Sequence, residues 1–170
     1  MSLQLHLGCG DFHLPEPWVN IDSRMQPGVD RVDNIGLLRR FSLESADRIY
    51  CSHALDHFTR WSYQSVLKRW HDLLRPGGEL WVSVIDFNVI AELYLIRKVP
   101  LRQLTGSLAA AQDYENNVRH VHFDRTMLAE DLILAGFRTV VRKEGPFFSD
   151  DCSASQVAGV NTSLNLIATK

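Results

Sequence analysis

The sequence has no surplus of charge of either sign, which limits the partners that charge alone could attract. Eighteen lysines and arginines stand against 20 aspartates and glutamates in 170 residues, a formal net charge of −2. Proteins that bind nucleic acids or acidic membrane surfaces usually carry a basic excess. We therefore expect no nucleic-acid partner. The expected binding partner is a small molecule.

Cysteines and long apolar runs are also scarce. Cys9, Cys51 and Cys152 are an odd number without CxxC spacing, so we expect neither a disulfide framework nor a metal site. No run approaches the roughly 18 apolar residues that span a membrane. The opening residues, MSLQLHLGCG, lack the basic and apolar regions of a signal peptide. The sequence therefore predicts a cytoplasmic protein without membrane contact.

The chain is long enough to bury a core of its own, since 45% of its 170 residues are hydrophobic. We expect residues 1–170 to form a single domain. Apolar runs of strand length alternate with helical or turn segments, which predicts a three-layer, Rossmann-like α/β fold with a mostly parallel sheet. The last two strands lack a helical crossover and should pair antiparallel. The seven expected strands are residues 3–7, 18–22, 28–33, 46–52, 79–85, 137–142 and 163–169.

The clearest helix is predicted at residues 60–74, where apolar side chains recur at helical spacing. Arg75-Pro76-Gly77-Gly78 should end it, because proline cannot continue a helix and glycine tolerates positive φ. Residues 88–123 are expected to form a helical insert that acts as a lid, whereas residues 143–162 show little pattern. The other expected helices are 88–97, 101–111 and 124–136.

A glycine turn, Gly8-Cys9-Gly10, directly follows the first expected strand, and Asp22 ends the second strand twelve residues later. A carboxylate in that position can accept hydrogen bonds from both hydroxyls of a ribose. Asp33 ends the third expected strand at the same sheet edge. Alternatively, the turn is only a tight structural turn and both carboxylates are solvated strand ends. The joint pattern favours a nucleotide-type ligand.

Among such ligands, a nicotinamide dinucleotide is disfavoured. Its fingerprint needs a third glycine and a full helix whose amino end faces the pyrophosphate. Here the third glycine is absent. The link to Asp22 contains Pro15 and Pro17, which leave room for no more than about one helical turn. A ligand with ribose and adenine but no phosphate fits better, and S-adenosylmethionine is such a ligand.

The segments LHLGCG, WVNID, IYCSHALDHF, LLRPGG and SLNLIATK together resemble a class I S-adenosylmethionine-dependent methyltransferase. The resemblance is to the small family with the pattern LHLGCG…GWVNID…EHF…LKPGG, and it covers nearly the whole chain. It implies a seven-stranded sheet with the last strand antiparallel. Asp56 stands where glutamate is common, and Arg75 where lysine is common. His6 or Leu7 stands where the wider superfamily is usually acidic, which leaves the methionine ammonium without its usual partner.

The resemblance also implies which residues bind the cofactor. The glycine turn would approach the methionine portion, and Asp22 would hold the ribose with Ser23 beside it. Asp33 would accept a hydrogen bond from the adenine amino group. Ser52 and His53 would line the methionine amino group and the methyl group. The implied cofactor-binding set is Gly8, Cys9, Gly10, Asp22, Ser23, Asp33, Asn34, Ile35 and Ser52.

Methyl transfer from a sulfonium is an in-line displacement, so the enzyme mainly holds donor and acceptor in line in a site shielded from water. A general base helps when the acceptor is a hydroxyl or a protonated amine. His53 and His120 are the predicted catalytic residues, and His57 and His122 are further candidates. The alternatives are a packing role for His57 and solvated positions for the loop histidines. Asp86 lies at the correct sheet edge, with a helix-cap role as its alternative.

The resulting hypothesis is a methyltransferase that moves a methyl group from S-adenosylmethionine to an oxygen or nitrogen of a small-molecule or sugar-type acceptor. The alternative is a cofactor-binding or scaffolding protein without turnover. The first expected strand begins at Leu3, so we expect the helices that usually precede it and cover the cleft to be absent, which favours this alternative. The sequence leaves the oligomeric state open, a homodimer included.

Overall fold

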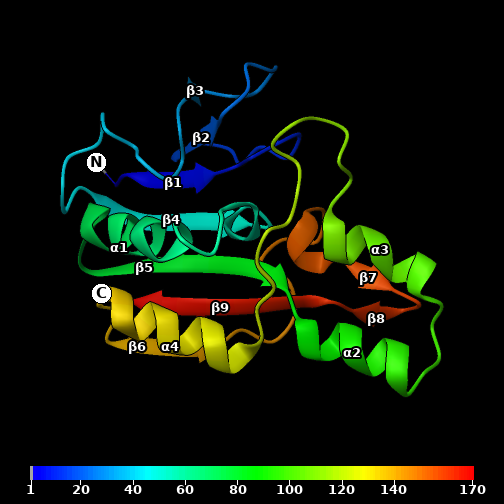
Figure 1. Ribbon diagram of the computed structural model, residues 1–170. Helices are drawn as coiled ribbons and strands as arrows, with labels where there is room; N and C mark the ends of the chain where they lie inside the picture. The colour runs from blue at the N-terminus through cyan, green and yellow to red at the C-terminus, as the bar shows by residue number, and fades with distance from the viewer. Residues whose placement is uncertain (1) are drawn as a thin grey trace.

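The computed structural model describes residues 2–170, which are built around a mixed sheet of seven strands (Figure 1). The first five strands in hydrogen-bonding order are parallel, and the sixth, β9, runs antiparallel to both of its neighbours. The predicted mostly parallel sheet with an antiparallel last strand is confirmed. The order is β3 (Arg31–Val32), β2 (Trp18–Asp22), β1 (Gln4–Leu7), β4 (Ala46–Ser52), β5 (Leu74–Ile85), β9 (Ser163–Thr169) and β6 (Thr139–Arg142).

Helices cover one face of the sheet and lie beyond one of its ends. On the covered face, α1 (Tyr63–Leu73) packs against α4 (Arg125–Ala135), whereas α2 (Phe87–Leu95) and α3 (Leu101–Ala109) lie past the carboxyl end of β5 (Figure 1). No helix within residues 2–170 is long and apolar enough to cross a membrane. The short elements are η1 (Leu55–His57), η2 (Cys152–Ala154) and the hairpin of β7 (Gln156–Val157) and β8 (Val160–Asn161).

The side chains of each strand alternate between two faces of the sheet. On β1, Leu5 and Leu7 belong to the main core together with Trp70 of α1. His6, between the two leucines, therefore points to the opposite face, where it stacks on Tyr50 of β4 with ring centroids 5.1 Å apart. Buried side chains thus lie on both faces, although helices cover only one of them.

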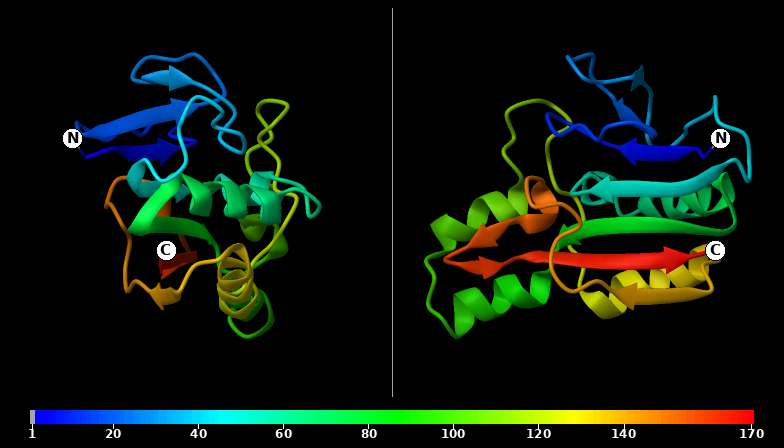
Figure 2. Two further views of the ribbon diagram at one scale, coloured as in Figure 1. Left: turned by 90° about the vertical axis from the view of Figure 1, so that its left-hand side faces the viewer. Right: turned by 180° about the vertical axis from the view of Figure 1, so that it is seen from behind.

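The second face is covered by residues 143–155, which contain no α-helix. Phe147 stacks on Trp81, with ring centroids 5.3 Å apart, and packs edge-on against Tyr50. Phe148 also packs against Tyr50, at 5.2 Å. Aromatic side chains bury a large apolar area per residue, so this short segment can replace a helical layer. Figure 2 shows it in orange, on the side of the sheet away from α1.

Helices occur at all four predicted places, and Gly136 ends α4 in the predicted left-handed conformation with φ of 113°. Several strand predictions were wrong in their bounds, and β6 begins at Thr139 and not at residue 137. β3 is confined to Arg31–Val32, and β5 begins already at Leu74, because Leu74 pairs with Ala46 ahead of a register shift. Neither η2 nor the β7–β8 hairpin, both within residues 143–162, was predicted from the sequence pattern.

Candidate functional site

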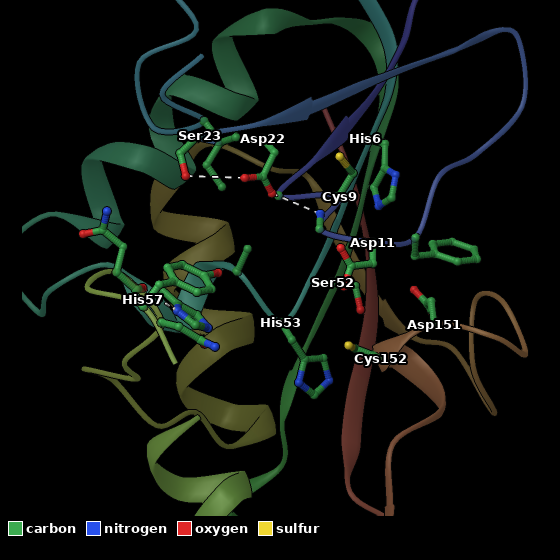
Figure 3. A pocket seen from close by; sticks show the side chains of 18 of the residues that line it. His6, Cys9, Asp11, Asp22, Ser23, Ser52, His53, His57, Asp151 and Cys152 are labelled. Atoms are coloured by element: carbon green, nitrogen blue, oxygen red, sulfur yellow. Dashed lines mark hydrogen bonds between the residues drawn. The ribbon is translucent and has the colours of Figure 1, made fainter. Parts of the chain in front are cut away.

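A cavity of about 1000 Å³ lies at the carboxyl ends of β1, β2, β3 and β4 (Figure 3). In open parallel sheets this is the edge where ligands bind. All the predicted cofactor-binding residues line the cavity, and so does His53, while their roles toward a ligand remain predictions. The cofactor-binding residues that the fold brings together are Gly8, Cys9, Gly10, Asp22, Ser23, Asp33, Asn34, Ile35 and Ser52.

The glycine turn leaves β1 with both of its glycines at positive φ, 68° for Gly8 and 53° for Gly10. Gly8 donates its N–H to the carbonyl of Ile21 at 2.8 Å, and Gly10 donates to the Asp22 carboxylate at 3.0 Å. A Cβ at Gly8 would lie 2.6 Å from the Cβ of Ala54, whereas a Cβ at Gly10 would meet nothing within 4 Å. Packing therefore requires glycine at position 8. At position 10 the missing side chain leaves space in the cavity.

Alanine substitutions should separate these two roles. Gly8→Ala is expected to lower the free energy of unfolding by about 2–4 kcal/mol, because it combines steric overlap with an unfavourable positive φ. Gly10→Ala should cost about 1 kcal/mol, since only the conformational penalty applies. Urea unfolding followed by circular dichroism measures both losses. Equal losses would contradict the packing role of Gly8.

Asp22 ends β2 with its carboxylate held in a fixed orientation. Its Oδ2 accepts the hydrogen bond from Gly10, and its Oδ1 accepts one from the backbone N–H of Arg24 at 2.9 Å. The residue is 7% exposed and lines the cavity. The two oxygens of a carboxylate can accept about four hydrogen bonds, so capacity remains for donors from a ligand. A pair of adjacent hydroxyls is a suitable donor set.

Two further polar atoms along the cavity have no hydrogen-bond partner within the described chain. Asp33 accepts the N–H of Asn34 through Oδ1 at 2.7 Å, but its Oδ2 is buried and unpartnered. The hydroxyl of Ser52, at the end of β4, is buried and unpartnered as well. Because buried polar atoms are nearly always hydrogen-bonded in native proteins, these two atoms indicate a polar ligand. An amino group is a suitable donor for the Asp33 carboxylate.

His53 is engaged through both of its ring nitrogens. Nδ1 lies 3.2 Å from the guanidinium of Arg119, which can only donate, so Nδ1 accepts. The ring proton is then on Nε2, which donates to the hydroxyl of Ser163 at 3.0 Å. Burial, reinforced by Arg119 and opposed by Asp56, lowers the pKa of His53 to about 4. Since a base needs a free lone pair, this geometry lends no support to the predicted catalytic role.

The low pKa of His53 predicts a loss of stability in mild acid. The pKa rises from about 4 in the folded chain to about 6.5 in the unfolded chain. The unfolded chain therefore binds more protons in this interval, and the free energy of unfolding falls as the pH drops from 6.5 toward 4. His53→Asn is the matched control, because asparagine does not titrate and tolerates the φ of 50° at this position.

Urea unfolding at about pH 7 and pH 5 measures this effect in both proteins. The loss of stability between the two pH values should be smaller in His53→Asn than in the wild type. Identical losses would show that carboxylates elsewhere, and not His53, cause the acid sensitivity.

The other predicted catalytic residue, His120, is exposed and does not line the cavity. Its backbone N–H donates to the carbonyl of Asp56 at 2.8 Å, which fixes the main chain only. The structure therefore does not bring His120 into the cavity with His53, and a catalytic role for it stays a prediction. His57 does line the cavity, with Nδ1 3.0 Å from the carbonyl oxygen of Asn116.

Sequence reasoning missed Asp11, which directly follows the glycine turn, and several cavity residues that come from distant loops. Asp11, Asp150 and Asp151 add their carboxylates to those of Asp22 and Asp33, and no lysine or arginine is found among the described residues that line the cavity. Because no hydrophobic period marks these loops, the sequence carried no signal for them. Arg24 Nε lies 3.6 Å from the Asp22 carboxylate, but the other four carboxylates have no ion pair within residues 2–170, so the cavity suits a cationic ligand. The expected insert also contributes Tyr114, Asn116 and Asn117.

Solved structures with the same architecture include several S-adenosylmethionine (SAM)-dependent methyltransferases. One from Thermotoga maritima, described as a possible histamine N-methyltransferase, matches 100% of this chain and 83% of its own with a TM-score of 0.66 and 18% identity. One from Methanosarcina mazei matches 99% and 92% with a TM-score of 0.62 and 19% identity. The Burkholderia thailandensis 1,6-didemethyltoxoflavin-N1-methyltransferase, solved with 1,6-didemethyltoxoflavin and S-adenosylhomocysteine, matches 99% and 71% with a TM-score of 0.59 and 16% identity.

The chain has the fold of these methyltransferases. No protein-family model matches the sequence, and no curated protein matches it. At identities below 20% the likeness establishes the fold and not the acceptor or the activity. Within residues 2–170, no group of three or more His, Cys, Asp or Glu side chains is arranged to hold a metal ion.

Proposed function

We propose that this protein is a SAM-dependent methyltransferase. The observation that carries the proposal is the fixed carboxylate of Asp22 together with the unpartnered Oδ2 of Asp33 beside the glycine turn. These residues follow neighbouring strands, since Asp22 pairs with Val32 in the parallel ladder of β2 and β3. One carboxylate matches the two hydroxyls of a ribose, and the other matches the amino group of adenine.

The same cavity disfavours a dinucleotide. Residues 11–17, which follow the glycine turn, contain no helix, so no helix amino end is directed at a pyrophosphate. No basic side chain of the described cavity lining is available to offset phosphate charge, and the lining carries five carboxylates. A sulfonium cofactor is favoured by this charge, whereas a dinucleotide is repelled by it.

Each side of the cavity then has a proposed role. Gly8, Cys9 and Gly10 would let the backbone approach the methionine portion, and Asp22 would hold the ribose with Ser23 beside it. Asp33 would accept from the adenine amino group, with the main chain at Asn34 and the apolar side chain of Ile35 framing the base. Ser52 would donate to or accept from the amino-acid portion. In these assignments the ligand would supply hydrogen-bond partners for Oδ2 of Asp33 and the hydroxyl of Ser52, which are buried and lack partners in the described chain.

S-adenosylmethionine supplies an electrophilic methyl group on a positively charged sulfur. The protein would hold this group in line with the acceptor and exclude water from it. His53 contributes by being neutral near pH 7, because its lowered pKa avoids a positive charge beside the sulfonium. A neutral amine acceptor needs no base, which fits a histidine without a free lone pair. A nitrogen or oxygen acceptor of small size is therefore proposed, with nitrogen favoured.

The insert supplies the proposed lid. Tyr114 from the loop after α3 packs on the guanidinium of Arg24, 3.9 Å from the ring centroid. This contact joins the insert to the segment that follows Asp22, and Tyr114 also lines the cavity. Since a cavity of about 1000 Å³ must hold both cofactor and acceptor, the acceptor is small. Free Cys9, Cys51 and Cys152 fit the proposed cytoplasmic location.

Isothermal titration with S-adenosylmethionine tests the proposed function. We expect saturable binding at micromolar to submillimolar concentration, and absence of binding would contradict the proposal. S-adenosylhomocysteine that copurifies with the expressed protein would support binding at the proposed site, and its formation from added S-adenosylmethionine and an acceptor would support turnover. Binding without turnover across a panel of amines and hydroxyl compounds would favour the alternative, a cofactor-binding protein without catalysis.

A further inference from the structure

The end of β1 carries His6 where an acidic residue would be expected to meet the methionine ammonium. His6 is 2% exposed, and its pKa is lowered, chiefly by burial. It is therefore neutral near pH 7 and provides no negative charge. Its Nδ1 is already within 3.0 Å of the side-chain oxygen of Asn20. Any counter-charge for an ammonium group must come from another part of the chain.

Asp151 reaches this end of β1 from the segment that covers the second face of the sheet. Tyr50, which stacks on His6, donates its hydroxyl hydrogen bond to Oδ2 of Asp151. The backbone N–H and the hydroxyl of Ser153 donate to Oδ1 at 2.9 and 2.5 Å. Three donors therefore fix the carboxylate while it lines the cavity. Figure 3 shows Asp151 and Ser52 on the side of the cavity away from His57.

The charge of Asp151 is not balanced by an ion pair anywhere in residues 2–170, whereas the buried carboxylate of Asp56 is paired with Arg119. Three hydrogen bonds leave Asp151 with capacity for one more. The hydroxyl of Ser52, buried and without a partner in the described chain, lines the same cavity. A partly buried, unbalanced carboxylate near an unsatisfied hydroxyl is a favourable site for an ammonium group.

We propose that Asp151 is the counter-ion for the α-ammonium group of the cofactor. Residues 143–162 then supply the acid that β1 lacks, and Tyr50 and Ser153 act as positioning residues for it. This inference rests on the proposed function, because the ammonium belongs to S-adenosylmethionine. It also gives the second face of the sheet a role in binding as well as in packing.

The test compares two ligands that differ in the amino-acid portion. S-adenosylhomocysteine carries the ammonium group, and methylthioadenosine lacks the whole amino-acid portion. Asp151→Asn should weaken S-adenosylhomocysteine binding by about 10- to 100-fold, the range for a charge-assisted hydrogen bond. Methylthioadenosine binding should change by less than about threefold, since its ribose and adenine contacts remain. Calorimetric titration of each protein with each ligand measures both effects.

Two further variants keep the outcome decisive. Glu144→Gln removes an exposed carboxylate of the same segment that does not line the cavity, and should change either affinity by less than about threefold, because exposed charge is screened. Tyr50→Phe removes a positioning hydrogen bond but keeps the Asp151 charge, so most of the preference for S-adenosylhomocysteine should remain. If Asp151→Asn weakens both ligands equally, or neither, the inference is overturned. If the wild type binds neither ligand, the proposed function itself fails.

Discussion

Asp22→Ala is expected to weaken S-adenosylmethionine binding at least about 100-fold. Two hydrogen bonds from ribose hydroxyls to a largely buried carboxylate would be lost, each worth about 1.5–3 kcal/mol. The substitution also removes the acceptor that holds the N–H of Gly10. The glycine turn would therefore lose its anchor at the same time as the ligand loses its partner. Isothermal titration of wild type and variant measures the change.

Controls separate the loss of the ligand contact from the loss of the turn. Asp22→Asn keeps one oxygen for Gly10 but loses the negative charge, so its affinity should lie between those of the wild type and of the alanine variant. Glu16→Ala removes an exposed carboxylate from the same link and should bind as the wild type does. An Asp22→Ala variant that melts like the wild type and still binds normally would contradict the proposed ribose site.

The side of the cavity formed by the glycine turn, Asp22 and Asp33 was predictable because its residues follow strands directly. A glycine turn after one strand and a carboxylate at the end of the next are local patterns, and parallel pairing brings such strand ends together. Asp33 was predictable for the same reason, although the strand before it is shorter than predicted. For these residues, position at the end of a strand in the sequence is enough to predict position at the edge of the sheet.

The opposite side of the cavity was not predictable, because its contacts join residues far apart in the chain. The hydrogen bond between Tyr50 and Asp151 spans 101 residues, and that between His53 and Ser163 spans 110. The segment that carries Asp151 has no helical or strand period, since aromatic packing and not a regular element holds it against the sheet. His53 could be placed beside the cavity from sequence. Its ring-nitrogen partners and low pKa could not.

Loss of Arg119 should strongly reduce stability. Its Nε lies 2.6 Å from the Asp56 carboxylate, and both side chains are almost fully buried, at 9% and 2% exposure. The guanidinium also donates to the carbonyl of Gly106 at 2.9 Å and to Nδ1 of His53. It therefore ties the insert, η1 and the end of β4 together. Arg119→Met leaves the buried Asp56 without its arginine partner and with only His57 Nε2 at 3.6 Å, which should cost about 3–5 kcal/mol.

Urea unfolding measures this loss, and two comparisons define its cause. Arg97→Met breaks an exposed ion pair with Glu92, in which the side chains are 53% and 49% exposed, and should cost less than about 1 kcal/mol. Arg119→Met combined with Asp56→Asn should recover part of the stability, because the unpaired charge is then absent. A double variant no more stable than Arg119→Met alone would show that the hydrogen bonds to Gly106 and His53, and not the buried ion pair, account for the loss.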